Sequence, residues 1–279
     1  MKELKDNSMI LIVMTLINCL VLWNFISSDK LMHGMGYCIF FYVSILTIYF
    51  FTKKIPPLNV VEIKSPKREL LLTILFAALG VVFLSINLSI KSNNQQLGFI
   101  IKLPLLLGML VCTFPVGIVT YLLIQKYKFS QLGISFKPLS YLLLGVIIWG
   151  VTGLFAYIFN KIGIIWVEGY KELGGVTGVI WQGVIMAGLA EEFSRFIMQT
   201  RLERFIKTSG FNILIATIIW AFMHFPINYF KGSPVNETVF YCIQIIPLGC
   251  IWGYLTHRTK SIVPSTMAHG MNLWGFQNG

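Results

Sequence analysis

The chain has few charged residues, and acidic ones are especially scarce. Only 12% of its 279 residues are charged and 11 are Asp or Glu, whereas 56% are hydrophobic. With a mean hydropathy of +0.75, this composition places the chain among polytopic membrane proteins. The expected fold is therefore all-α, a set of transmembrane helices within one membrane domain.

Several familiar signatures are also missing. The chain has no HExxH zinc motif, no internal repeat and no segment long enough for a separate soluble domain. The first hydrophobic stretch lacks a small-residue cleavage site, so we interpret it as a membrane span. The cysteines form no CxxC or CxxH spacing and are expected to be small apolar side chains: Cys19, Cys38, Cys112, Cys242 and Cys250.

Apolar runs approach the length of about 20 residues that a spanning helix needs. The predicted segments are Met9–Ser27, Met32–Phe51, Leu70–Ile90, Leu103–Gln125, Tyr141–Lys161, Gly178–Thr200, Phe211–Phe225, Thr238–Thr256 and Pro264–Phe276. Pro226 disfavours a helical conformation in the residue before it, and Pro264–Phe276 is too short to span alone. We therefore expect about eight transmembrane helices.

Basic residues gather on one side of the predicted membrane. With a cytoplasmic N-terminus, most of the 22 Lys and Arg residues fall on the inner side, in residues 53–68, 126–137, 201–207 and 258–260. This is the positive-inside pattern of cell-membrane proteins. The net charge of +11 is thus explained by the lipid bilayer as a partner, and no nucleic acid is expected.

Glu191 and Glu192 are the acidic residues predicted to lie deep inside a hydrophobic stretch. A carboxylate in hydrocarbon costs about 2.5–3.5 kcal/mol on translocon scales. Arg195 follows Glu192 by three residues and Glu191 by four. Residues at these spacings are neighbours on a helix, so Arg195 can pair with either carboxylate. Because a structural ion pair needs only one carboxylate, the pair indicates a functional site that faces a protein-lined cavity.

Two further polar runs fall on other segments, Trp220–His224 and His269–Asn272. At the helical rise, Glu191, His224 and His269 lie about 15, about 21 and about 14 Å from the presumed inner ends of their segments. Each residue also has a purely structural interpretation. A lone intramembrane His commonly forms a hydrogen bond between helices, and Asn272 could do the same. Trp220 could be a packing aromatic. The similar depth of the three runs favours one shared site.

At these runs the chain resembles the CPBP family, also called Abi or CAAX-protease-like intramembrane proteases. The family includes type II CAAX prenyl endopeptidases and bacterial relatives linked to bacteriocin self-immunity. Its motifs are a Glu-Glu pair followed by Arg, an aromatic residue separated from a His by three residues, and a final His followed by Asn or Asp. They are matched by Glu191-Glu192 with Arg195, Trp220 with His224, and His269 with Asn272.

The match is not identical in spacing. The Arg and the Asn each stand one residue nearer to their partners than is usual in the family, which keeps them on the same helical face. The resemblance covers roughly residues 141–279, the expected catalytic core of a single domain that spans 1–279. Residues 1–140, the N-terminal helices, are similar to the family only in being hydrophobic.

The resemblance implies an intramembrane endopeptidase that acts on a membrane-associated peptide or protein. Glu191 and His224 would activate water, Arg195 would hold Glu192, and His269 with Asn272 would stabilise the oxyanion. No cofactor is expected. If the enzyme were zinc-dependent, the ligands would be Glu191, His224 and His269, but Arg and Asn are poor zinc ligands and a metal-free mechanism is favoured.

Two other functions remain open at this stage. One is a catalytically inactive membrane scaffold or bacteriocin-immunity protein that binds a partner in the same cavity. The other is a proton-coupled transporter, since intramembrane Glu and His also form proton relays, although no paired halves with broken helices are visible. The sequence does not identify the substrate; short loops favour a bacterial signalling or bacteriocin-type peptide over a prenylated protein.

Overall fold

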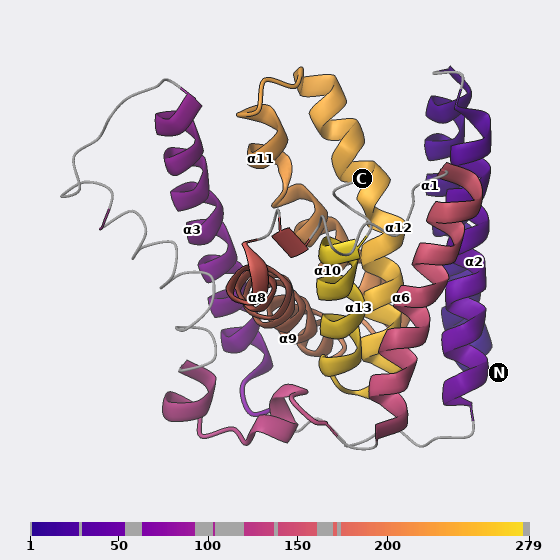
Figure 1. Ribbon diagram of the computed structural model, residues 1–279. Helices are drawn as coiled ribbons and strands as arrows, with labels where there is room; N and C mark the ends of the chain where they lie inside the picture. Colours follow the sequence, from indigo (N-terminus) through magenta and orange to yellow (C-terminus); the bar gives the residue numbers. More distant parts are fainter. Residues whose placement is uncertain are drawn as a thin grey trace.

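The computed structural model describes residues 2–27, 30–53, 63–92, 103, 120–136, 139–160, 170–171 and 174–275. Regular structure in this part of the chain is entirely helical, which confirms the predicted all-α class (Figure 1). Its elements are α1 (Lys2–Ser27), α2 (Leu31–Thr52), α3 (Pro66–Ser92), η1 (Thr120–Ile124), η2 (Phe129–Leu132), α6 (Leu139–Asn160), α8 (Gly175–Gly178), η3 (Val179–Glu192), α9 (Phe193–Leu202), α10 (Ser209–Phe222), α11 (Phe225–Tyr229), α12 (Val235–Thr259) and α13 (Val263–Gly275).

The chain is a multi-pass membrane protein. Among the described residues, five helices are long and apolar enough to cross a bilayer: Leu31–Thr52, Pro66–Ile90, Leu139–Phe159, Ser209–Tyr229 and Val235–Thr259. Leu11–Ser27 is a shorter apolar helix. The predicted segment Leu103–Gln125 lies mostly outside the described residues. A total of about eight transmembrane helices is compatible with these findings.

The long helices run side by side, and their ends explain the distribution of charge. The C-terminal ends of α2 and α12 and the N-terminal ends of α3 and α6 lie at one end of the bundle, at the bottom of Figure 1. The chain's N-terminus lies towards the same end. The basic segments next to these helix ends therefore share one side, and a cytoplasmic location for that side stays a prediction.

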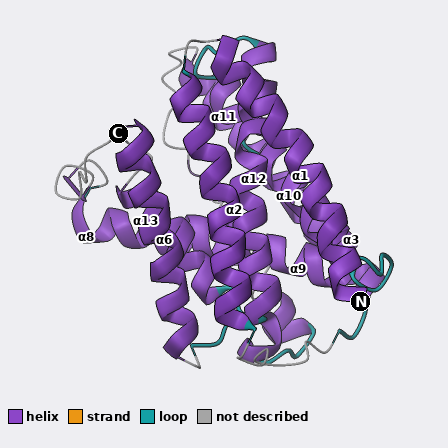
Figure 2. Ribbon diagram, turned by 90° about the vertical axis from the view of Figure 1, so that its right-hand side faces the viewer, coloured by secondary structure: helices purple, strands orange, loops and turns teal. Residues whose placement is uncertain are grey.

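The run from α8 through η3 to α9 takes a different course from the long helices. It is continuous from Gly175 to Leu202. Figure 2 shows it crossing the bundle, with η3 packed on α13 and α9 packed on α3 and α10. The predicted segment Gly178–Thr200 is thus helical but does not run parallel to the others. Distance along it is not depth in the membrane, and that part of the depth argument is corrected.

Prolines and chain turns end the C-terminal helices close to where the sequence predicts. The helix α10 stops at Phe222, and α11 begins at Phe225 with Pro226 in its first turn. Proline is tolerated there because the first-turn N–H groups have no intrahelical acceptor. This break leaves His224 in the short turn between the two helices, close to the C-terminal end of α10.

Two groups of buried apolar side chains hold the elements together. The larger one joins α1, α2, α6, α10, α12 and α13, with Met14, Phe41 and Leu144 among its fully buried members. The smaller one packs α9 against the segment that contains η1 and η2, through residues such as Phe196 and Leu132. Together they fix α9, which carries Arg195, and α13, which carries His269, within one packed interior.

A buried ion pair joins the start of α3 to the end of α9. Arg201 Nε donates to Glu69 Oε2 at 2.7 Å, and both side chains are completely buried. The hydroxyl of Tyr127 donates to the other carboxylate oxygen, also at 2.7 Å. The interpretation of Arg201 as one of the inner-side cations missed this buried pair. A residue at the end of an apolar segment can turn inward to a partner as readily as outward to water.

Glycines allow η3 and α13 to approach at backbone distance. A Cβ atom on Gly270 would collide with the carbonyl oxygen of Gly183, and one on Gly188 would collide with the side chain of Thr266. Small residues at such crossings let membrane helices pack closely. This contact sets the spacing between the helix that carries Glu192 and the helix that carries His269.

We therefore expect Gly270→Ala to lower the free energy of unfolding by about 1–3 kcal/mol, the usual cost of overpacking. Gly150→Ala in α6 is the matched control, since a Cβ there meets nothing within 4 Å. Thermal unfolding of both variants in detergent measures the effect. Equal stability of the two variants would contradict the close helix contact.

Candidate active site

The structure brings five of the six predicted site residues into one cluster. Glu191 and Glu192 end the π-helical η3, and Arg195 lies in the first turn of α9. His224 follows α10, and His269 lies on α13. The change from π-helix to α-helix falls directly after Glu192, and π-helical turns occur frequently at functional sites.

Glu192 is the buried centre of the cluster. Its side chain is completely buried, and Oε2 accepts a hydrogen bond from Arg195 Nη2. The other oxygen, Oε1, lies 2.9 Å from His269 Nδ1. Each oxygen of this carboxylate thus has a charged or polar partner, which is the condition for placing a carboxylate away from water.

Glu191 occupies the open edge of the same cluster. Its side chain is 28% exposed, and Oε2 accepts a hydrogen bond from Trp220 Nε1 at 2.5 Å. The same oxygen lies 3.7 Å from His224 Nε2 and 3.9 Å from His269 Nε2. Both separations exceed a direct hydrogen bond. Two imidazoles therefore face one carboxylate oxygen without contacting it.

The hydrogen bonds made by the Nδ1 atoms determine what the Nε2 atoms can do. His224 Nδ1 lies 3.0 Å from the carbonyl oxygen of Trp220, which can only accept, so Nδ1 carries the proton. A neutral His224 then presents an unprotonated Nε2 towards Glu191. The Nδ1 of His269 donates in the same way to Glu192 when that carboxylate is ionised.

Aromatic rings enclose the buried half of the site. The ring of Trp252 stacks on His269 at 3.8 Å between centroids, with an angle of 17° between the planes. The guanidinium of Arg195 lies 5.5 Å from the ring of Trp220 and 5.7 Å from that of Trp252. These cation–π contacts keep Arg195 in place while water is excluded from it.

Exposure divides the cluster into two parts. The side chains of Glu191 and His224 are 28% and 21% exposed, whereas that of His269 is 4% exposed. Glu192 and Arg195 are buried. An incoming molecule can therefore reach Glu191 and His224, while Glu192 and Arg195 support them from inside the protein.

Asn272 stands apart from this network. It is buried on α13, one turn beyond His269. Within the described residues, no hydrogen bond joins its side chain to Glu191 or Glu192. Its predicted part in oxyanion stabilisation stays a prediction.

Sequence reasoning missed two members of the site. Trp220 was matched to the family motif together with His224 but was otherwise treated as a packing aromatic, and the structure shows it donating a hydrogen bond to Glu191. Trp252 gave no signal at all, because a Trp in a long apolar helix is indistinguishable from a core residue until its neighbours are known.

The alternative zinc ligands, Glu191, His224 and His269, lie around one carboxylate oxygen, and the absence of a metal ion stays a prediction. Among the described residues, no group of three His, Cys, Asp or Glu side chains is placed to hold a metal ion. The oxygen of Glu191 that faces both imidazoles accepts a short hydrogen bond from the indole of Trp220.

Carboxylates and imidazoles that meet in the interior of a helical membrane protein mark a functional site. Residues 174–274 match the model of a family described as type II CAAX prenyl endopeptidase Rce1-like, so this part of the chain is similar to that family. This confirms the resemblance and supports CAAX-type protease activity in general terms. Neither the curated proteins nor the solved structures give a match.

The matched segment begins just before α8, ends within α13, and contains all six predicted site residues. The helices that precede it lie outside the match. The expected boundary between N-terminal helices and catalytic core at residue 141 therefore stays a prediction.

A third charged cluster joins Glu203, just after α9, to the C-terminal end of α12 and offers a comparison with the site. Glu203 Oε1 lies 3.2 Å from His257 Nδ1 and 3.7 Å from Lys260 Nζ. Burial opposes ionisation of Glu203, but the His257 hydrogen bond and the Lys260 charge outweigh it, so the pKa of this carboxyl lies below its ordinary value. The side chains of Glu203 and Lys260 stay 29% and 22% exposed.

We expect Arg195→Met to reduce the free energy of unfolding by about 3–5 kcal/mol, because it leaves Glu192 buried without its counter-ion. Lys260→Met removes a cation from a partly exposed carboxylate and should cost less than about 1 kcal/mol. Denaturant titration of the two purified variants compares them. Similar losses would mean that Glu192 is solvated rather than buried.

Proposed function

We propose that the protein is an intramembrane endopeptidase that hydrolyses a peptide bond in a membrane-associated protein or peptide. The observation that carries this proposal is the position of Glu191. Its Oε2 lies 3.7 and 3.9 Å from two imidazole nitrogens at the accessible edge of an otherwise buried polar cluster. The Rce1-like match supports the same reaction class.

In this mechanism a water molecule binds between Glu191 and His224. Both groups can accept a hydrogen bond from it, since Nε2 of neutral His224 carries no proton. The water then presents its lone pair to the peptide carbonyl. Glu191 takes a proton as the oxygen–carbon bond forms, and returns it to the leaving amine as the carbon–nitrogen bond breaks.

The buried residues balance the charge of this site. Two ionised carboxylates and the Arg195 guanidinium leave one net negative charge, which a protonated His269 would neutralise. Nδ1 of His269 donates to Glu192, so Nε2 is the nitrogen that faces Glu191. Protonated Nε2 could then donate to the oxyanion, with Asn272 as the second proposed donor; such donors commonly contribute about 2.7–4 kcal/mol each.

The proposed chemistry requires no metal ion. Glu191 supplies the base, and the donors supply the electrostatic stabilisation that a Lewis acid would otherwise provide. Full activity of purified protein in the presence of a chelator is the expected result, and loss of activity that added zinc restores would contradict it.

The substrate is proposed only by class. The family model that matches is described for prenyl endopeptidases that act on CAAX proteins. For this chain we propose a membrane-associated peptide or protein, since Glu191 belongs to a bundle whose long helices are apolar enough to span a membrane. A bacterial signalling or bacteriocin-type peptide fits the short loops.

Glu191→Gln should lower kcat/KM by about 10²–10⁴-fold, the usual contribution of a general base. The change preserves side-chain size and an acceptor for the Trp220 hydrogen bond, so folding should be unaffected. Peptides and new protein termini are profiled in cells that express wild type or the variant at matched levels. A product found only with wild type identifies the substrate.

Glu237→Gln is the control for that experiment, because it removes an acidic residue from the first turn of α12 outside the cluster. It should leave the profile unchanged. Identical profiles for wild type and Glu191→Gln, with a cellular phenotype that survives, would contradict the protease and indicate a membrane scaffold or immunity protein.

Trp220→Phe should lower kcat with little change in KM, because Glu191 loses the donor that orients it. A hydrogen bond to a charged group contributes about 1.5–3 kcal/mol, which corresponds to roughly 10–100-fold in rate. Kinetics with the product-yielding peptide from the profile measure the change. Trp181→Phe is the matched control, since Trp181 lies on η3, the helix that carries Glu191, and is 42% exposed. Equal rates for the two variants would show that Trp220 only packs.

A further inference from the structure

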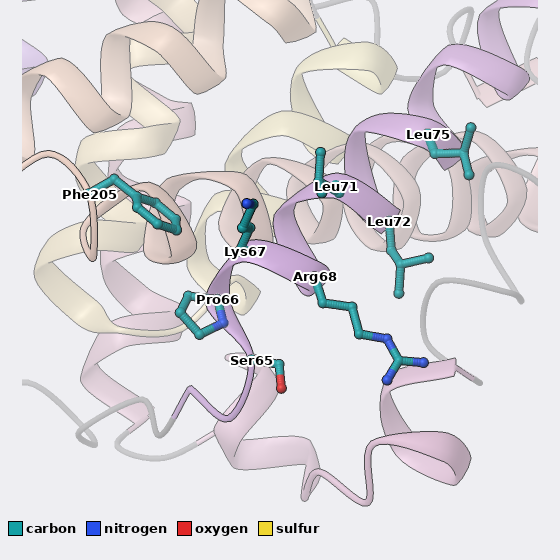
Figure 3. A pocket seen from close by; sticks show the side chains of 8 residues that line it. All are labelled: Ser65, Pro66, Lys67, Arg68, Leu71, Leu72, Leu75 and Phe205. Atoms are coloured by element: carbon teal, nitrogen blue, oxygen red, sulfur yellow. The ribbon is translucent and has the colours of Figure 1, made fainter.

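A groove runs along the first turns of α3, away from the polar cluster. Its volume is about 560 Å³, within the range of roughly 300–1,000 Å³ that ligand sites occupy. Figure 3 shows the side chains that line it, from Ser65, the beginning of α3 and the turn after α9: Ser65, Pro66, Lys67, Arg68, Leu71, Leu72, Leu75 and Phe205.

The groove has a charged end and an apolar end. Lys67 and Arg68 lie in the first turn of α3 and are exposed. Leu75 lies seven residues further along the helix than Arg68, about 10 Å deeper. Leu71 and Leu75 are 59% and 52% exposed, so the apolar wall is open to an incoming chain.

The two cations have no acidic partner among the described residues. The nearest carboxylate in sequence, Glu69, is buried and bonded to Arg201 on α9. Glu203, close to Phe205 in the chain, is engaged by His257 and Lys260. An anion that enters the groove therefore meets positive charge that the protein itself does not neutralise.

The position of the groove selects its ligand. The transmembrane segment Pro66–Ile90 begins at this point, so the cations lie at the level of lipid headgroups and the leucines at the level of the acyl chains. The end of the bundle is the one predicted to face the cytoplasm, where anionic lipids are enriched. We infer that the groove binds one anionic phospholipid, with its phosphate at Lys67 and Arg68 and an acyl chain along Leu71, Leu72 and Leu75.

Binding at this position stabilises the contact between α3 and α9. Glu69 lies in the same turns of α3 and pairs with Arg201 at the end of α9. The first turn of α9 carries the site residue Arg195. A lipid that orders the start of α3 thus reinforces the buried pair. The inference concerns binding and does not depend on the proposed chemistry.

The test uses the full-length protein, purified in detergent and titrated with phosphatidylglycerol or with phosphatidylcholine of the same acyl chains. Native mass spectrometry measures the retained lipid. Wild type should bind phosphatidylglycerol more tightly than phosphatidylcholine. The double variant Lys67→Gln/Arg68→Gln should bind it roughly 30-fold more weakly, from about 1 kcal/mol per cation.

Lys128→Gln/Lys207→Gln is the matched control, because it removes two exposed cations that do not line the groove. It should bind like wild type. An equal loss in the control, or equal retention of both lipids by wild type, would overturn the site. Displacement of the lipid by soluble glycerol phosphate at similar concentration would show a free-phosphate site instead. Thermal unfolding without added lipid checks that both double variants are folded.

Discussion

The carboxylate of Glu192 is the constraint on which the rest of the site depends. A carboxylate in the interior is stable only when its oxygens are paired, and here Arg195 and His269 meet that need from α9 and α13. The pairing sets the relation between the two helices and directs Nε2 of His269 towards Glu191. Glu191 can therefore remain accessible, since its neighbour provides the anchor.

The helix α9 carries two buried Arg–Glu ion pairs, one near each end. Arg195 near its beginning pairs with Glu192, and Arg201 near its end pairs with Glu69. Aromatic rings border both guanidinium groups: Trp220 and Trp252 at the first, Tyr121 and Tyr127 at the second. A short helix with a polar composition is thereby held in an apolar interior at both ends.

Much of this arrangement could be predicted from the sequence, for reasons that also show the limits of such reasoning. Glu191, Glu192 and Arg195 contrast with their apolar surroundings, so their cluster was visible without coordinates. The course of the Gly175–Leu202 run was not, because hydropathy cannot distinguish lipid from protein interior. Arg201 looked like a loop cation, and nothing in the sequence connected it with Glu69, 132 residues away.

The contact between Gly183 and Gly270 bears on how the protein responds to its membrane. At this contact the backbones of η3 and α13 touch directly, without side chains between them. The two helices therefore cannot adjust their spacing through a change of side-chain rotamers. Bilayers of different thickness change the tilt of long spanning helices. The crossing pair would follow such a tilt as one rigid element, and the distance between Glu192 and His269 would be the same in thin and thick membranes.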